Sequence, residues 1–198
     1  MKIGIFGGSY NPPHKMHLDI ALDLLNNGYV DKIIFVPTGS KYKYKTNLLS
    51  DEHRLEMLML TIKNDARLTI SDYELKDEVV YTCETLAHFR EVYPDDEIYF
   101  ICGADNLSYM DKWKNGLEIL EKYKILVIDR KTNNLKSILK QFSKYRKNIV
   151  VASIKARDVS STEIRELIAN GDYKSLEKYL DEDVIKYIKK NKLYGNGE

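Results

Sequence analysis

Two histidines, His14 and His17, stand three positions apart in the stretch GIFGGSYNPPHKMHL (4–18), directly behind a short apolar run. Pro12 and Pro13 precede them and suit the start of a helix, where a missing backbone N–H costs nothing. In the first turn of that helix the two imidazoles would lie side by side, next to N-terminal amides that attract anions. The spacing therefore indicates donors for phosphate oxygens. The plainer alternative is one exposed and one packed histidine.

The same loop carries Gly7 and Gly8, which would let a ligand approach the backbone, although a tight strand-to-helix turn explains them equally well. The loop lacks the G-x-G-x-x-G fingerprint, and the second apolar run ends in Val-Pro-Thr (36–38) without the acid that would hold a ribose. The chain also lacks the G-x-x-x-x-G-K-[ST] motif. These patterns argue against an NAD-dependent oxidoreductase and a P-loop protein. A metal site would need a third ligand, and the sequence offers none at a recognisable spacing.

The elements that must position these residues follow from the alternation of short apolar runs with amphipathic stretches. Strands are predicted over 2–6, 32–36, 67–71, 97–102, 124–128 and 148–153, and helices over 14–27, 51–63, 82–93, 134–146, 161–170 and roughly 173–190. The alternation predicts an α/β fold, a Rossmann-like doubly wound parallel sheet with helices on both faces and a helical C-terminal segment. We expect one domain over 1–198, with a core over 1–153 and a helical part over 154–198.

Ligands of such sheets bind outside the carboxyl ends of the strands, where the strand order reverses. The histidine loop follows the first predicted strand, and Gly103 and Asp105 follow the fourth, which would lie beside the first. A plain turn is the ordinary alternative for that second segment. The hydroxyls in SSTEIR (160–165) would cap the helix that they open. That capping role leaves Arg165 unexplained.

Two of these segments resemble motifs of one family. Residues 7–17 are similar to the G-G-[ST]-F-[DN]-P-x-H-x-G-H signature of the nucleotidyltransferases that adenylylate small phosphate compounds, and SSTEIR matches the family's S-S-T-x-[IV]-R element. The whole chain resembles the bacterial nicotinate-nucleotide adenylyltransferases within that family. The residues that carry this closer resemblance are Tyr81 and Thr82 at the start of the third helix and the lone Trp113, for which core packing is the alternative.

The resemblance implies adenylyl transfer from ATP to nicotinate mononucleotide, which gives nicotinate adenine dinucleotide and pyrophosphate in NAD biosynthesis. It implies catalytic roles for His14, His17 and Arg165. Implied ATP contacts are Gly7, Gly8, Ser9, His17, Gly103, Asp105, Ser160, Ser161, Thr162 and Arg165. We expect the mononucleotide to contact Lys41, Lys43, Lys45, Tyr81, Thr82 and Trp113. Mg²⁺ would arrive with ATP, since it needs few protein ligands, and no protein-bound metal is expected.

The chain departs from the family pattern at three places. Met16 stands at a usual glycine position, on what we expect to be an exposed helix face, and Asn11 at a frequent aspartate position. Residues 39–45 (GSKYKYK) replace a Pro-Pro-His-Lys segment, so one of their lysines would supply the missing basic contact unless the run is a solvated loop. Nicotinamide mononucleotide or phosphopantetheine as acceptor, and a non-catalytic nucleotide-binding homologue, stay open alternatives.

The amino-acid composition of the chain limits the kinds of partner and the cellular location that we expect. The chain has 31 basic and 30 acidic residues, a net charge of +1, so no overall field favours nucleic acid or an anionic membrane. No apolar stretch approaches the ~20 residues of a membrane span, and the N-terminus does not resemble a signal peptide. Cys83 and Cys102 lack a partner motif, which fits a reducing cytoplasm. We expect a cytoplasmic protein and leave a homo-oligomer open.

Overall fold

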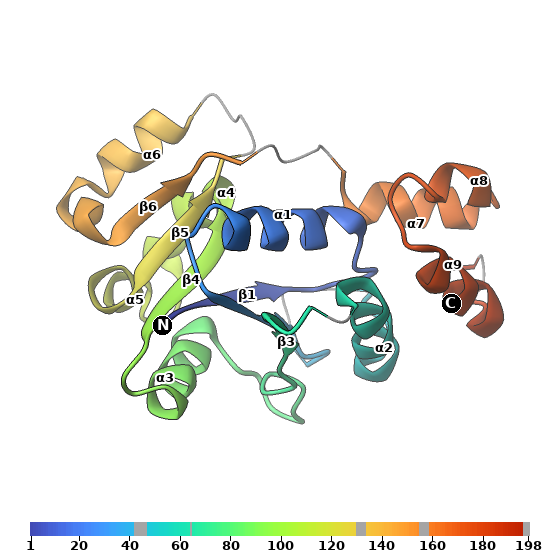
Figure 1. The fold of residues 1–198 in the computed structure, drawn as a ribbon, viewed down its shortest axis with the longest axis horizontal. Coiled ribbons are helices and arrows are strands. Elements are labelled where there is room, and N and C mark those ends of the chain that lie inside the picture. Colours follow the sequence, from blue (N-terminus) through green and yellow to red (C-terminus); the bar gives the residue numbers. More distant parts are fainter. Residues whose placement is uncertain (42–46, 64, 130–133, 155–158, 196–198) are drawn as a thin grey trace.

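Six parallel strands form a single sheet in the computed structural model, which describes residues 1–41, 47–63, 65–129, 134–154 and 159–195. The strands run in the spatial order β3-β2-β1-β4-β5-β6 (Figure 1). Their bounds are β1 (Lys2–Gly8), β2 (Lys32–Pro37), β3 (Leu68–Ile70), β4 (Glu97–Gly103), β5 (Lys124–Ile128) and β6 (Ile149–Ala152). The order reverses between β1 and β4, which pair directly. The predicted doubly wound sheet is confirmed, and each strand lies within two residues of its expected bounds.

The helices are α1 (Lys15–Asn26), α2 (Asp51–Ile62), α3 (Thr82–Val92), α4 (Ala104–Ser108), α5 (Gly116–Lys122), α6 (Leu135–Gln141), α7 (Ser161–Ala169), α8 (Tyr173–Leu176) and α9 (Glu182–Asn191), with 3-10 turns η1 (Met110–Lys112) and η2 (Ser143–Asn148). The helix expected over 134–146 ends at Gln141 and continues as η2. The single helix predicted over 173–190 is wrong: Asp181 accepts from the N–H of Asp183 at 3.2 Å and caps a separate helix, α9.

Alternate residues of each strand face opposite sides of the sheet, and each side has its own helices and core. On β4, Phe100 and Cys102 pack with α3, α4, α5 and α6, whereas Tyr99 and Ile101 pack with α1 and α2. Met16 belongs to the α1 side and is buried, so its expected position on an exposed helix face is wrong. Cys83 and Cys102 are free thiols that contribute to the core.

The C-terminal helices form a third cluster with α2. Ile164, Leu176 and Ile188 are buried there, and Met57 of α2 joins them. Figure 1 shows α7, α8 and α9 at one end of the molecule, beside α2 and past the first turn of α1. This placement brings the second motif, at the start of α7, close to the histidine loop. None of the described helices is long and apolar enough to cross a membrane.

Candidate active site

A cavity of about 150 Å³ lies at the carboxyl ends of β1 and β2, beside the position where the strand order reverses. This is where the fold rule places a ligand. Five of the predicted site residues line the cavity: Gly7, Gly8, Ser9, Thr82 and Trp113. Residues from two halves of the sequence therefore meet at one site.

Gly7 and Gly8 both line the cavity, but their surroundings differ. A Cβ on Gly7 would meet nothing within 4 Å, whereas a Cβ on Gly8 would lie 2.9 Å from the Tyr10 ring. Tyr10 is buried with a positive φ of 47° and donates its hydroxyl to the carbonyl of Phe6. A side chain at position 8 would therefore have to displace the buried Tyr10 ring.

His14 and His17 stack on each other at the start of α1, with ring centroids 3.7 Å apart. His14 is the N-cap, one position before the predicted first turn, and only 4% of it is exposed, whereas His17 is partly exposed. The backbone N–H of His14 donates to Nδ1 of His17 at 3.1 Å. Neutral His17 therefore carries its proton on Nε2, the atom that can donate to a phosphate. Catalytic roles for both stay predictions, and His17 is the more accessible of the two.

The first amides of α1 already have protein acceptors. The N–H of Lys15 donates to the carbonyl of Tyr179 at 2.8 Å, and that of His17 to the carbonyl of His14 at 2.9 Å. These two amides were expected to help bind an anion at this helix end. In this structure the amide of Lys15 instead joins α1 to the C-terminal helices, and the amide of His17 bonds to the N-cap residue of its own helix.

The two family-like motifs contact each other directly. Ser161 donates its hydroxyl to the carbonyl of Pro12 at 3.0 Å, and Nη1 of Arg165 donates to the carbonyl of Asn11 at 2.8 Å. The paired residues are 149 and 154 positions apart in the chain. The start of α7 therefore holds the loop that leads into the histidine pair.

The remaining hydroxyls of this motif act within α7. Ser160 caps the helix by accepting from the N–H of Glu163 at 3.2 Å, and Thr162 accepts from Nη2 of Arg165 at 3.1 Å. The capping alternative thus holds for Ser160. Arg165, which capping left unexplained, acts as a clamp between the motifs. The ATP contacts predicted for these residues stay predictions.

Gly103 and Asp105 lie where β4 passes into α4. Asp105 is exposed in the first turn of α4 rather than in a plain turn. Its Oδ1 lies over Gly103, where a Cβ would be only 2.3 Å away. Gly103 thus leaves room for the carboxylate, and the ribose contact predicted for Asp105 stays a prediction.

The residues expected to bind the mononucleotide are only partly brought together. Thr82 begins α3 and lines the cavity with Trp113, which packs edge-on to Phe100 at 6.0 Å. Tyr81 is the N-cap of α3, next to Thr82. Lys41 is exposed in the turn after β2 and is not among the cavity-lining residues. Lys43 and Lys45 lie outside the described residues, so the lysine contact stays a prediction.

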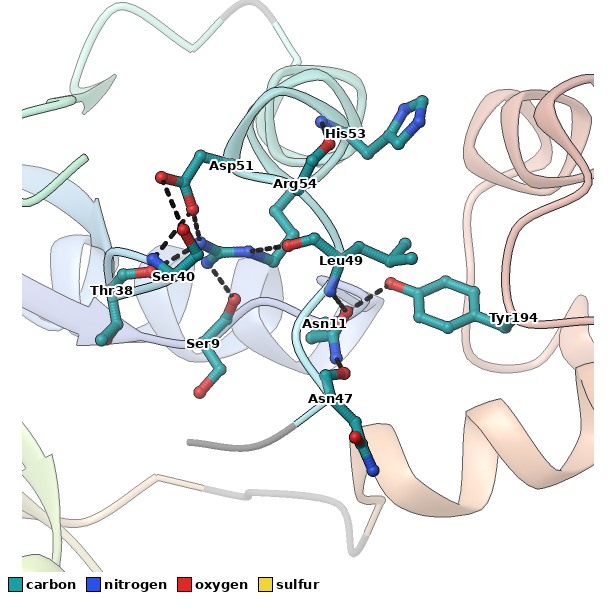
Figure 2. A network of polar contacts seen from close by, with 11 residues as sticks. Ser9, Asn11, Thr38, Ser40, Asn47, Leu49, Asp51, His53, Arg54 and Tyr194 are labelled. Carbon is teal, nitrogen blue, oxygen red and sulfur yellow. Dashed lines mark hydrogen bonds and ion pairs between the residues drawn. The ribbon is translucent and has the colours of Figure 1, made fainter. Parts of the chain in front are cut away.

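A buried arginine that the sequence analysis missed ties the site loops together (Figure 2). Arg54 on α2 is 0% exposed and donates to the carbonyls of Ser9 at 2.7 Å, Thr38 at 2.6 Å and Leu49 at 3.1 Å. It also forms an ion pair with Asp51. Arg54 therefore joins the loop after β1, the end of β2 and the start of α2.

A family model described as cytidylyltransferase-like matches residues 5–167 of the chain. The chain belongs to the cytidylyltransferase-like family. Curated relatives from Clostridium tetani, Clostridium acetobutylicum and Caldicellulosiruptor bescii are 40%, 39% and 38% identical to it. Each alignment covers 98% of this chain and 98% or 99% of the relative, and each relative bears the name "Probable nicotinate-nucleotide adenylyltransferase". The family resemblance predicted from the motifs is confirmed.

Solved structures of Plasmodium falciparum nicotinic acid mononucleotide adenylyltransferase are similar to this cytidylyltransferase-like chain over 98% of its length. The complex with NaAD has a TM-score of 0.83 at 24% identity, with 97% of that chain covered. The complex with APC has a TM-score of 0.79 at 25% identity, with 96% covered. These likenesses confirm the Rossmann-like fold.

The structure also explains the asparagine that this family member carries at a frequent aspartate position. Asn11 is buried, and its Nδ2 donates to the carbonyl of Asn47 at 2.9 Å. Its Oδ1 accepts from the N–H of Leu49 at 3.3 Å and from the hydroxyl of Tyr194 at 2.9 Å (Figure 2). Position 11 must therefore both donate and accept, which an amide does and an ionised carboxylate does not.

Asn11→Asp is accordingly expected to destabilise the protein by about 1–3 kcal/mol, because the carbonyl of Asn47 loses its donor and faces a carboxylate oxygen. Equilibrium urea unfolding measures the change. Asn134→Asp, at the exposed N-cap of α6, is the matched control and should stay within about 0.5 kcal/mol of the parent protein. Equal stability of the two variants would contradict the assignment.

Proposed function

We propose that this protein transfers the adenylyl group of ATP to nicotinate mononucleotide, giving nicotinate adenine dinucleotide and pyrophosphate in NAD biosynthesis. The observation that carries the proposal is the 38–40% identity to nicotinate-nucleotide adenylyltransferases along nearly the whole chain. The site geometry supports it, since the motifs meet beside a cavity at the carboxyl ends of β1 and β2.

The proposed reaction needs no covalent enzyme intermediate. The phosphate of the mononucleotide has a second pKa of about 6 and is largely ionised at neutral pH, so it attacks the α-phosphorus of ATP without a general base. A new P–O bond forms, the bond from the α-phosphorus to the bridging oxygen breaks, and pyrophosphate leaves with that electron pair. The protein contributes in-line positioning and neutralisation of the developing charge.

His17 and Arg165 are the side chains to which we assign that neutralisation. His17 presents a proton on Nε2 because its Nδ1 already accepts from the backbone. Arg165 lies within hydrogen-bonding distance of the same loop and carries a permanent charge. His14, stacked against His17 and buried, fixes the orientation of the His17 ring.

We propose that Mg²⁺ enters the site bound to ATP rather than to a protein cage. Mg²⁺ keeps most of its waters and needs only one or two carboxylates besides phosphate oxygens. No group of three or more His, Cys, Asp or Glu side chains with metal-binding geometry occurs among the residues that the structure describes. The ion then offsets phosphate charge as part of the substrate.

Pyrophosphate release from MgATP, measured separately with nicotinate mononucleotide, nicotinamide mononucleotide and phosphopantetheine, tests the proposal. We expect the highest kcat/KM with nicotinate mononucleotide and release dependent on the acceptor. A higher value with phosphopantetheine would identify a different acceptor class. ATP binding without pyrophosphate release from any mixture would indicate a non-catalytic homologue.

A further inference from the structure

The cavity contains a carboxyl group that the proposed mechanism does not use. Glu74, in the segment between β3 and α3, lines it together with Thr82 and Trp113. Ile5, Val36 and Phe100 form an apolar part of the cavity wall. The volume of about 150 Å³ equals that of an engineered protein cavity that binds benzene. A six-membered aromatic ring therefore fits, and a polar substituent on it would need a polar partner in the wall.

Glu74 is held in place by both its backbone and its side chain. The hydroxyl of Thr85, which is buried, donates to Oε1 of Glu74 at 2.6 Å. The carbonyl of Glu74 lies so close to Gly39 that a Cβ there would be 2.2 Å away. The Thr85 hydroxyl also lies 3.4 Å from the carbonyl of Tyr81. With Oε1 bonded to Thr85, Oε2 is the carboxyl oxygen that we assign to a ligand.

The carboxyl group can change charge near neutral pH. Burial raises the pKa of Glu74 to about 7, although the hydrogen bond from Thr85 opposes the shift. Burial and the Glu74 charge raise the pKa of Tyr10, in the loop after β1. Burial and the charges of nearby glutamates, Glu84 before Glu74, raise the pKa of Tyr73. Both phenols therefore stay neutral over the range in which Glu74 ionises.

Other titratable side chains near the cavity lie in the segment of Glu74 itself, on α3, on the Trp113 segment, at the starts of α1 and α4, and after β2. In the first of these, Nζ of Lys76 lies 3.9 Å from the ring centre of Tyr73. On α3 and the Trp113 segment, Glu84 and Lys114 form an ion pair at 2.8 Å. His88 on α3 stacks on Tyr73 at 3.9 Å, and His17 packs edge-on to Tyr10 at 4.9 Å. Asp105 is the neighbour in sequence of Asn106, which lines the cavity. Thr38, after the end of β2, also lines the cavity, and the first charged residue that follows it is Lys41.

We propose that Glu74 is a specificity-determining residue for the substituent on the pyridine ring. Its neutral carboxyl donates from Oε2 to the carboxylate of nicotinate mononucleotide. Its ionised form repels that carboxylate and accepts from the carboxamide N–H of nicotinamide mononucleotide. The preference for the acid substrate over the amide is then set by one proton on the enzyme. This inference rests on the proposed function.

The test is the ratio of kcat/KM for nicotinate mononucleotide to kcat/KM for nicotinamide mononucleotide, measured from pH 6 to pH 9 with saturating MgATP. Both acceptors share the same phosphate, ATP and His17, so the titration of those groups cancels in the ratio. With MgATP saturating, kcat/KM for the acceptor reports the enzyme–MgATP complex before the acceptor binds. The ratio should therefore be flat below about pH 7, where Glu74 is protonated. Above the Glu74 pKa of about 7 it should fall by roughly tenfold per pH unit.

Glu74→Gln provides the decisive variant, because a glutamine amide donates a hydrogen bond at every pH. We expect its ratio to be independent of pH and no lower than the parent value at pH 6. If the amide substrate turns over too slowly to measure, the parent-to-Glu74→Gln ratio of kcat/KM with nicotinate mononucleotide should show the same fall. His88→Gln removes a nearby imidazole, and its ratio of kcat/KM values should depend on pH as the parent ratio does.

A parent ratio that is flat from pH 6 to pH 9 would overturn the proposal, as would a slope that survives in Glu74→Gln or disappears in His88→Gln. These failures differ from a failure of the proposed function. If neither pyridine mononucleotide accepts the adenylyl group, the function is wrong. If nicotinate mononucleotide accepts it and the ratio is flat, only the role of Glu74 is wrong.

Discussion

His17→Ala is expected to lower kcat for adenylyl transfer by about 10²–10³-fold, the usual loss when one preorganised donor to a developing oxyanion is removed. The structure gives His17 this role because its Nδ1 accepts from the backbone of His14 and its proton lies on Nε2. Initial rates of pyrophosphate release with nicotinate mononucleotide measure the effect. Circular dichroism and thermal unfolding check that the variant is folded.

His53→Ala is the matched control for this prediction. His53 is also a partly buried histidine near the start of a helix, but its Nδ1 lies 2.9 Å from the hydroxyl of Tyr187 on α9. Its ring packs against Tyr187 and lies outside both motifs, so its loss should leave kcat unchanged. Near-normal turnover by a folded His17→Ala protein would remove His17 from the mechanism.

Arg54→Ala is expected to lower the free energy of unfolding by at least about 3 kcal/mol. Three carbonyl groups, of Ser9, Thr38 and Leu49, lose the donors that Arg54 supplies, and each buried acceptor left unsatisfied costs about 1–3 kcal/mol. Equilibrium urea unfolding gives the value. A loss of this size is a large part of the 5–15 kcal/mol that stabilises a typical domain.

Two further variants make this measurement specific to Arg54. Arg67→Ala removes an exposed arginine that pairs with Asp65, and it should barely move the unfolding midpoint because exposed ion pairs contribute little. Arg54→Lys keeps the charge but not the fork of donors, so its stability should fall between those of the parent and Arg54→Ala. If Arg54→Ala unfolds at the same denaturant concentration as Arg67→Ala, the network in Figure 2 does not stabilise the fold.

Local sequence predicted the strands well and the C-terminal helices less well, for physical reasons. Strands of a parallel sheet are buried on both faces and appear as continuous apolar runs, so little else fits segments such as 124–128. Between residues 173 and 190 the apolar positions keep a helical spacing across the break, since Leu176, Leu180 and Val184 all pack into one cluster. Periodicity alone could not show that Asp181 starts a new helix there.

Charged residues inside the site were the hardest to predict. Arg54 shares a helical face with Met57 and Leu58, and that position on an apolar stripe was the available signal. Glu74 follows the carboxyl end of β3, and ligands of such sheets bind at the carboxyl ends of the strands. This location was the available signal for Glu74. Neither signal identifies a buried charge, because burial depends on Ser9, Thr38 and Thr85, which reach these side chains only in the folded chain.

By itself the sequence determined the order of strands and helices, the chemical groups of the motifs and hence the family, because these depend on residue types and short spacings. Tertiary structure alone decided which of those groups face a ligand and which hold the protein together. His14 is buried under His17, the amide of Lys15 is occupied by Tyr179, and Arg165 clamps the loop at Asn11. Each of these outcomes depends on a contact partner or a packing environment that the chain supplies only when folded, and in the last two the partner lies more than a hundred residues away in sequence.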